Sequence, residues 1–474
     1  MPCPRGVERR IYDKLSNWRW PRKENAAVKK SLEIHAEGLR REEGRRVPSR
    51  TEREAVLKVI REGYEYPNTR VPAGFSRGEV EGWAEGRYEV TVEDFESVKD
   101  SIQRDLNKDS TPGYPYVALG GKNKQVMENY GSFIWNTVAQ SFNNALRLGD
   151  KVFSMSPSEL VKAGVCDVVK VFIKDEPHSL KKIESGKLRL ISSVSLVDQI
   201  KTRLLCRTQN LNEIESWESC PSKPGLGLHD DGLQVIAANI KRFLSQGVVA
   251  EADVSGWDWS VQDWELEFDA ECRAALAGAD PKGVFAFLLR VHAYCVANSV
   301  YVLPNGEMYE QTVPGAQLSG DYNTSSTNSR MRVCASLFSR LWAGKPLLVD
   351  GRIPVSAMGD DSFELDFPEL QENMRSIGHN VRFVKRSTSL QGVEFCSQVF
   401  DEDGFAAPAD PSKTVYRFLS HKVTFSEYPE LWAQLSWYLR HQKKGDERDI
   451  ISGLGFARIE LANKLNGFTS TEER

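Results

Sequence analysis

Residues 354–365, with the sequence PVSAMGDDSFEL, constrain the fold of this chain more than any other segment. Two short runs of strand-forming residues flank a Gly-Asp-Asp sequence, and glycine beside aspartate is typical of the tight turn in a β-hairpin. The pattern therefore predicts a hairpin with Asp360 and Asp361 at its tip. By itself such a turn is more often a plain connection than a functional site, so the neighbouring segments decide its meaning.

A second acidic strand end precedes the hairpin by about a hundred positions. Residues 248–254 (VVAEADV) predict a buried strand that stops at Gly256 and carries Asp253 near its end. If this strand lies beside the hairpin in one sheet, Asp253 meets Asp360 and Asp361. Phosphoryl transfer by two divalent ions needs carboxylates from different segments at adjoining strand ends, and Mg²⁺ prefers such oxygen ligands.

A helix with small polar residues is expected between the acidic strand at 248–254 and the hairpin at 354–365. Ser319 and Gly320 open a loop, and the helix expected from about residue 322 to beyond 341 presents Thr324 and Asn328 on one face, because they are four positions apart. If Asp258 meets Asn328, the carboxylate and the amide can hydrogen-bond a ribose 2′-hydroxyl, the group that distinguishes RNA from DNA. The alternative is a small-residue helix that only packs closely.

Basic residues lie on a predicted strand–turn–strand unit. Residues 168–176 (VVKVFIKDE) and the run LRLIS are strand-like, with a lysine-rich turn between them, and alternation places Lys187 and Arg189 on the same side of the second strand. Together with Lys174 they can bind a triphosphate, and Glu176 is expected to orient one of these cations. The alternative is a solvated basic hairpin, to which Lys181 and Lys182 are assigned.

Composition excludes several classes of protein. The 474 residues include 40% hydrophobic and 27% charged side chains, and the net charge of −4 hides a basic N-terminal region and an acidic stretch after residue 250. Eight scattered cysteines without a C-x-x-C pair argue against a zinc ribbon or a disulfide scaffold, and favour a reducing compartment. The chain contains no P-loop and no G-x-S-x-G motif, which disfavours an ATPase motor and a serine hydrolase.

We expect a soluble intracellular protein with no membrane span. The N-terminus lacks the apolar stretch of a signal peptide. Residues 284–303 are the most apolar segment, but Arg290, His292 and Asn298 interrupt it, so it is predicted to form a buried helix followed by a strand. Helices and strands are mixed without regular alternation, which predicts an α+β fold. Further helices are expected in residues 1–50, near 430–440 and near 459–464.

The motifs, taken in chain order, resemble those of RNA-dependent RNA polymerases of positive-strand RNA viruses, and most of all the sobemovirus and polerovirus group. They are T-P-G-Y-P at 111–115, K-D-E at 174–176, K-L-R-L-I at 187–191, D-x-x-x-x-D at 253–258, S-G-x-x-x-T-x-x-x-N at 319–328 and G-D-D at 359–361. The resemblance is dense over roughly residues 105–400.

The resemblance implies a right-hand fold with fingers, palm and thumb, in which helices flank an antiparallel palm sheet. The implied fingers comprise residues 1–245, with the basic N-terminal extension and a palm segment near 195–215. The palm continues at 246–275, a further fingers segment spans 276–310, the palm resumes at 311–400, and the thumb spans 401–474.

The resemblance also implies roles for individual residues. Asp253, Asp360 and Asp361 would be catalytic and bind Mg²⁺, for which Mn²⁺ can substitute. The implied nucleotide-binding residues are Lys174, Lys187, Arg189, Asp258, Ser319, Gly320, Thr324 and Asn328. The implied template-binding residues are Thr111, Pro112 and Gly113. Lys385 is the candidate general acid for the leaving pyrophosphate, with Arg386 as an alternative, and residues 392–397 (GVEFCS) resemble a primer-grip turn.

The expected partners are template and product RNA, nucleoside triphosphates, a genome-linked protein primer, and viral or host replication proteins. The implied location is the host-cell cytoplasm, in membrane-associated replication complexes that form through such partners. Whether synthesis is protein-primed or starts de novo stays open. Two rival functions are a reverse transcriptase, which usually has an aromatic residue where this chain has Asp258, and a noncatalytic RNA-binding protein with a decayed palm.

Overall fold

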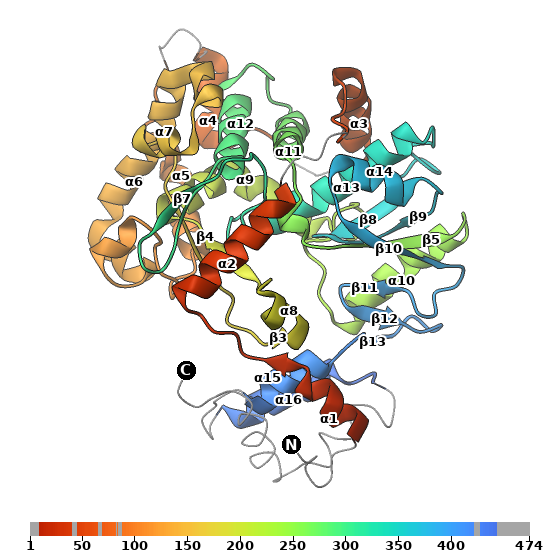
Figure 1. The fold of residues 1–474 in the computed structure, drawn as a ribbon. Helices are drawn as coiled ribbons and strands as arrows, with labels where there is room; N and C mark the ends of the chain where they lie inside the picture. Colours follow the sequence, from red (N-terminus) through yellow and green to blue (C-terminus); the bar gives the residue numbers. More distant parts are fainter. Residues whose placement is uncertain are drawn as a thin grey trace.

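The computed structural model describes residues 9–39, 45–64, 69–81, 83, 88–420 and 427–442. Within these ranges the chain is a mixture of helices and four sheets, three of which are wholly antiparallel (Figure 1). The helices and strands do not alternate regularly along the chain. The predicted α+β character is therefore confirmed.

The sheet that carries the acidic segments has the strand order β10-β5-β9-β8, and all neighbours are antiparallel. Its strands are β5 (Val249–Val254), β8 (Val355–Met358), β9 (Asp361–Leu365) and β10 (Val381–Ser387). β8 and β9 form the predicted hairpin, in which Met358 pairs with Asp361. Gly359 has a φ of +63°, a conformation that glycine adopts without strain, and this permits the two-residue turn.

The two faces of this sheet are different. Val249 and Phe363 contribute to the apolar cluster formed with α10 (Asp230–Leu244), whereas Ala250 and Ala252 belong to the main core. The helices α13 (Thr324–Trp342) and α14 (Leu370–Ile377) contact the sheet from this second side. Because successive residues of a strand point to opposite faces, Asp253 lies on the same face as Val249.

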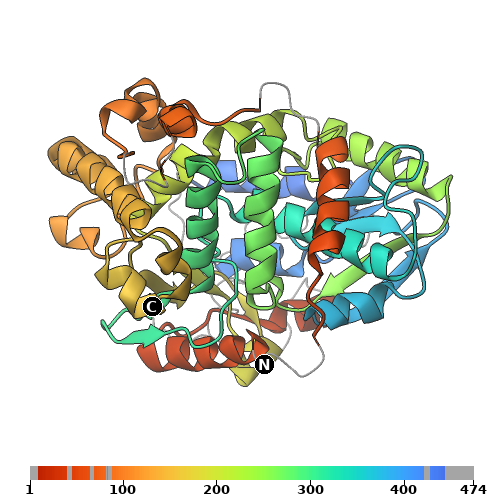
Figure 2. The ribbon, with the colours of Figure 1, turned by 90° about the horizontal axis from the view of Figure 1, so that it is seen from above.

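A bundle of buried helices supports α13. The helices α11 (Asp263–Leu276) and α12 (Val284–Ala297) lie side by side (Figure 2), and α3 (Arg50–Gly63) packs against α11 and α13. The apolar stretch at 284–303 forms α12 and then β6 (Val300–Val302), as predicted. None of the helices in the described ranges combines the length and the apolar character that crossing a membrane requires.

A second four-stranded sheet holds the basic unit and corrects one detail of the prediction. It has the order β4-β2-β6-β7, with strands β2 (Val169–Ile173), β4 (Leu190–Ser193), β6 and β7 (Met308–Glu310). The lysine-rich segment expected to be a turn forms the short helix α8 (Leu180–Ser185). Lys187 and Arg189 therefore precede β4 instead of lying on it, because the strand begins only where pairing with β2 begins.

The remaining helices pack against other helices or against strands of the second sheet. They are α1 (Arg9–Ser16), α2 (Asn25–Ala36), α4 (Ala73–Glu81), α5 (Glu96–Asp105), α6 (Asn123–Leu148), α7 (Pro157–Lys162), α9 (Leu196–Glu215), α15 (Ser412–Ser420) and α16 (Tyr428–Tyr438). Two small sheets comprise β1 (Trp18–Arg19) with β3 (His178–Ser179), and β11 (Glu394–Phe395) with β12 (Gln398–Phe400) and β13 (Ala406–Pro408).

The early and late parts of the described chain share one apolar cluster. Leu15 of α1 packs with Val415 and Leu419 of α15, and the Trp18 indole donates a hydrogen bond to Ser412 Oγ at 2.9 Å. Figure 1 shows α1, α15 and α16 together at the bottom of the molecule. The helix predicted near 430–440 is confirmed as α16, and the one predicted near 459–464 lies outside the described residues.

Candidate active site

The predicted acidic residues meet at one edge of the four-stranded sheet. β5 and β9 are antiparallel neighbours, with Val249 opposite Leu365 and Ala250 opposite Glu364. If this register continues for three residues, it brings Asp253 level with Asp361 on the same face of the sheet. Asp360 occupies the adjoining turn. The predicted adjacency of the two acidic segments in one sheet is therefore confirmed.

The electrostatics show how closely these carboxylates interact. Asp360 and Asp361 reach solvent, yet the protein surrounds them on several sides. Partial desolvation and repulsion from Asp360, Glu394 and Asp253 raise the pKa of Asp361 to about 7. Desolvation also raises the pKa of Asp360, and Asp253 adds to this effect. The edge thus concentrates negative charge that is not fully compensated by the protein.

The oxygen donors at this edge suit a divalent cation that is also bound by water and substrate. Within the described ranges, no three or more His, Cys, Asp or Glu side chains are grouped closely enough to form a metal cage on their own. However, Mg²⁺ is usually bound by only one or two carboxylates, together with water and substrate phosphates. The donors here are carboxylate oxygens, and a cation would relieve the repulsion that raises the pKa of Asp361. The donor set fits Mg²⁺ or Mn²⁺.

The predicted pair of Asp258 and Asn328 is present. Asn328 Nδ2 donates to Asp258 Oδ1 at 2.8 Å, and Trp257 Nε1 donates to Asn328 Oδ1 at 3.0 Å. The indole thereby orients the amide with its NH₂ group toward the carboxylate. Desolvation and the nearby charge of Asp360 raise the pKa of Asp258 to about 6, and the bond from Asn328 opposes them. The pair offers both a donor and an acceptor to a ligand hydroxyl.

The loop before α13 is attached to the second sheet by close backbone contacts. Ser192 N donates to Ser319 Oγ at 3.0 Å, and a Cβ on Gly320 would lie only 2.2 Å from the Ser192 carbonyl oxygen. Thr324 Oγ1 lies 2.8 and 2.7 Å from the carbonyl oxygens of Leu318 and Asp321. The hydroxyls of Ser319 and Thr324 thus already bond to the backbone, and their predicted contact with a nucleotide stays a prediction.

A cluster of cations surrounds Glu176 beside the acidic edge. Glu176 forms ion pairs with Arg189 at 2.9 Å, Lys413 at 2.9 Å and Lys174 at 3.4 Å. Although burial alone would raise the pKa of Glu176, these cations lower it to about 2. The predicted role of Glu176 in orienting a cation of the basic strand–turn–strand unit is confirmed for Arg189. Three cations share one carboxylate, so the cluster retains positive charge for an anionic ligand.

Lys187, the third predicted cation of the basic unit, also lies near the acidic strand β5. Lys187 Nζ lies 3.9 Å from the position that a Cβ would take on Gly256, which lies between the end of β5 and Asp258. Arg189 contributes favourable charge interactions at both Asp258 and Asp360. The basic unit and the acidic edge therefore face each other.

Sequence reasoning missed two basic residues at this site. Lys413 belongs to α15 and joins the Glu176 cluster from a distant part of the chain, for which the sequence holds no signal. Arg382 Nε lies 3.5 Å from Asp253 Oδ2, and Arg382 NH2 donates to Ser255 Oγ at 3.0 Å. Its proximity to Asp253 could have been suspected, because it belongs to the same run, NVRFVK, that contains Lys385.

The structure separates the two candidates for the general acid. Lys385 is opposite Glu251 in the β5–β10 pair and forms an ion pair with it at 3.2 Å. Its ammonium group also donates to the Gly392 carbonyl oxygen. Arg386 instead pairs with Asp366 at 2.7 Å. Because Glu251 shares its face of β5 with Asp253, only Lys385 lies on the carboxylate side of the sheet. Its role stays a prediction.

The predicted template loop packs mostly inward. Leu196 N donates to the Pro112 carbonyl oxygen at 2.8 Å, and a Cβ on Gly113 would lie 3.0 Å from Ser195 Cα. Pro112 and Gly113 are buried at the start of α9, whereas Thr111 is exposed. Of the three residues, Thr111 is therefore the one that presents a surface to a ligand, and the other two hold the loop in place.

The segment GVEFCS contains the first strand and the turn of a hairpin beside the acidic edge. Its strands β11 and β12 join through Cys396 and Ser397, whose φ angles are +52° and +59°. The pKa of the Cys396 thiol is raised by burial and by the negative charges of Asp361 and Asp360, so the turn lies close to those carboxylates. The predicted turn is confirmed, and its contact with a primer stays a prediction.

Comparison with known proteins agrees with these motifs. Residues 7–409 match the sequence model of a family described as viral RNA-directed RNA polymerase. The chain is 49% identical over 416 aligned positions to the RNA-directed RNA polymerase of Mushroom bacilliform virus, covering 84% of this chain and 98% of that protein. It is 34% identical to replicase polyprotein P2AB of Southern cowpea mosaic virus, covering 97% of this chain and 47% of the polyprotein. It is 31% identical to protein P1-P2 of Potato leafroll virus, covering 87% and 38%. The chain thus spans less than half of these two longer relatives.

Proposed function

Because the chain belongs to the viral RNA-directed RNA polymerase family, we propose that the acidic sheet edge catalyses nucleotidyl transfer onto RNA with two divalent ions. The observation that carries this proposal is the meeting of Asp253 with Asp360 and Asp361 opposite the cations around Glu176. When bound, the ions would supply positive charge that activates the primer 3′-hydroxyl and stabilises the leaving pyrophosphate.

The basic cluster is proposed to bind the incoming triphosphate. Arg189 and Lys174 are already oriented by Glu176, and Lys187 lies over the loop after β5. Lys413 extends the same cluster from α15. Charge-assisted bonds from such cations position phosphate groups against the carboxylates. Lys385 is the proposed proton donor to pyrophosphate, for which it would exchange its contacts with Glu251 and Gly392.

The Asp258–Asn328 pair is proposed to recognise the ribose 2′-hydroxyl. A hydroxyl both donates and accepts a hydrogen bond, and the pair offers a carboxylate acceptor and an amide donor. The Trp257 indole holds the amide in the required orientation. This supports a ribonucleotide substrate and disfavours the reverse-transcriptase alternative.

The right-hand arrangement is proposed with the boundaries stated above. The four-stranded antiparallel sheet and its helices would form the palm, and α9 supports this because it lies within the segment 195–215 and packs beneath α13. The helices α15 and α16 would belong to the thumb.

RNA template, nucleoside triphosphates, a genome-linked protein primer and replication proteins are the proposed partners. The proposed site of action is a membrane-associated complex in the host cytoplasm.

A primer-extension assay tests the proposed function. The full chain is incubated with an RNA template, an RNA primer, Mg²⁺ and either ribo- or deoxynucleoside triphosphates. We expect efficient extension with ribonucleotides only. Preferential use of deoxynucleotides would favour a reverse transcriptase, and RNA binding without extension would favour a noncatalytic protein.

Replacing Asn328 by alanine should relax the choice of sugar. The variant loses one hydrogen-bonding partner of the 2′-hydroxyl, worth about 1.5 kcal/mol, so the ratio of kcat/KM for ribo- over deoxynucleotides should fall about 10-fold. Single-nucleotide incorporation with both substrates measures this ratio. Asn305→Ala, in the exposed turn between β6 and β7, is the control and should leave the ratio unchanged. Unaltered discrimination in Asn328→Ala would contradict the assignment.

A further inference from the structure

The turn that carries Asp360 is bonded to the helix that carries Asn328. The backbone N–H of Gly359 donates to Ser329 Oγ at 2.8 Å, and Ser329 Oγ in turn donates to the Ser325 carbonyl oxygen at 2.7 Å. Ser329 is fully buried, with 0% of its surface exposed. Its hydroxyl therefore joins α13 to the turn between β8 and β9 without access to solvent.

The Gly359 N–H needs such a partner because of the turn geometry. Met358 pairs with Asp361, so the ladder of the hairpin ends below the turn and provides no strand acceptor for Gly359. A backbone N–H that is turned toward protein costs free energy unless an acceptor is supplied. The Ser329 hydroxyl supplies it, and the next residue after Gly359 is Asp360.

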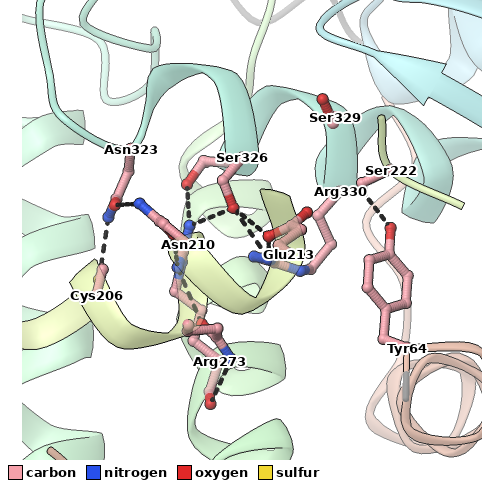
Figure 3. Close-up of polar contacts among 12 residues, drawn as sticks. Tyr64, Cys206, Asn210, Glu213, Ser222, Arg273, Asn323, Ser326, Ser329 and Arg330 are labelled. Carbon is pink, nitrogen blue, oxygen red and sulfur yellow. Dashed lines mark hydrogen bonds and ion pairs between the residues drawn. The ribbon is translucent and has the colours of Figure 1, made fainter. Parts of the chain in front are cut away.

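The helix that bears Ser329 is itself held rigidly from the opposite side. Figure 3 shows Arg330 and Ser326 directed toward Glu213 of α9, on a different side of α13 from Ser329. Arg330 bonds Glu213 at 2.8 Å and Asp269 of α11 at 2.7 Å, and Arg330 and Glu213 are fully buried. These buried ion pairs, with the hydrogen bond from Ser326 to Glu213, attach α13 to both α9 and α11.

The base of the hairpin is attached to the same helix. Arg332 NH2 donates to Glu364 Oε1 of β9 at 2.7 Å, and Ser336 Oγ donates to the other carboxylate oxygen. Arg332 and Glu364 are also fully buried. The hairpin is therefore anchored to α13 at its base by an ion pair and at its tip by Ser329, one position from Asn328.

We propose that Ser329 is a positioning residue that holds the Gly359–Asp360 turn in register with the ribose-recognising face of α13. The inference rests on the proposed function and deepens it. Because Ser329 is fully buried, its hydroxyl is not available to a metal ion or a nucleotide. It acts through the Gly359 backbone, which places the Asp360 carboxylate relative to Asp253 and to the Asp258–Asn328 pair.

Ser329→Ala tests the proposal, because it removes only the hydroxyl group and keeps the Cβ of the side chain. Loss of a supporting contact behind a metal ligand typically costs about 10- to 100-fold in metal affinity or activity. We expect kcat for single-nucleotide incorporation to fall about 10-fold with the KM for the nucleotide unchanged. We also expect the affinity for Mn²⁺, measured by calorimetry without RNA, to fall by a similar factor.

Ser339→Ala is the matched control. Ser339 lies on the same helix and is equally buried, but its hydroxyl donates only to the Ala335 carbonyl oxygen at 2.8 Å, one turn back. The control should lose less thermal stability than Ser329→Ala, which also leaves the Gly359 N–H without its acceptor, and it should retain wild-type kcat and Mn²⁺ affinity. This separates a general packing loss from a loss of turn position.

The outcomes distinguish this inference from the proposed function. Equal loss of kcat in both serine variants, or wild-type Mn²⁺ affinity in Ser329→Ala, would overturn the role of Ser329. If the wild-type chain bound Mn²⁺ but extended no primer, the proposed function would fail, and the comparison of Mn²⁺ affinities would still decide the role of Ser329.

Discussion

Asp360→Ala is expected to abolish nucleotide incorporation while RNA binding persists. Asp360 lies in the turn beside Asp361, and it interacts electrostatically with Asp253 across the sheet edge. Removal of its carboxylate takes away a proposed ligand for the ions, whose charge stabilisation is worth several kcal/mol, so incorporation should fall by about 1000-fold or more. RNA affinity depends chiefly on Lys and Arg contacts with phosphates and should change little.

Primer extension and a filter-binding or fluorescence assay for RNA measure the two properties on the same preparation. Asp403→Ala provides a control, because Asp403 is an exposed acid in the turn before β13. It should extend primers at the wild-type rate. Extension by Asp360→Ala at a near wild-type rate would refute the assignment of the acidic edge as the catalytic centre.

Arg330→Ala is expected to lower the free energy of unfolding far more than the loss of an exposed ion pair would. The Arg330 guanidinium is fully buried and pairs with Glu213 and Asp269 (Figure 3). Burial alone would raise the pKa of Asp269, but Arg330 and Arg273 lower it, so the carboxylate depends on these cations to stay charged. Removing one partner of a buried ion pair leaves an uncompensated charge and costs about 3–5 kcal/mol.

Urea unfolding of the wild type and the variant gives this difference in the free energy of unfolding. The control is Arg50→Ala, which breaks an ion pair of similar length, 2.9 Å to Glu54, between exposed side chains. An exposed pair contributes at most about 1 kcal/mol, because solvent screens it. Comparable losses in the two variants would show that the buried network does not hold α13.

Much of the site was predictable because its parts are local. Glycine beside aspartate, between strand-forming runs, predicted the β8–β9 hairpin, and the structure confirms it with Met358 opposite Asp361. The four-residue spacing of Thr324 and Asn328 predicted one helix, which is α13. The pairing of Asp258 with Asn328 followed from the resemblance to a polymerase family as well as from chemistry, and it is present.

Other features were predicted at the wrong residues, because a sequence pattern does not show where a helix or a strand begins. The lysine-rich segment after β2 was expected to be a turn and forms α8, since it contains enough residues for one helical turn before Gly186. β4 begins after Arg189, because only from Leu190 onward does the backbone pair with β2. Residues 180–185 (LKKIES) contain neither glycine nor proline, and residue propensities alone did not decide between a turn and a helix.

The sequence by itself determined the acidic turn, the acidic strand end, the amphipathic helices and their order, because turn chemistry and residue periodicity act over a few neighbouring residues. Only the tertiary structure decided three contacts at the site. Lys413 shares Glu176 with Arg189. Arg382 contacts Asp253, and Ser329 bonds Gly359. Each of these contacts joins separate elements of the fold. A hydrogen bond or ion pair forms only within a few ångströms, and no local pattern specifies which distant side chains the packing will bring that close.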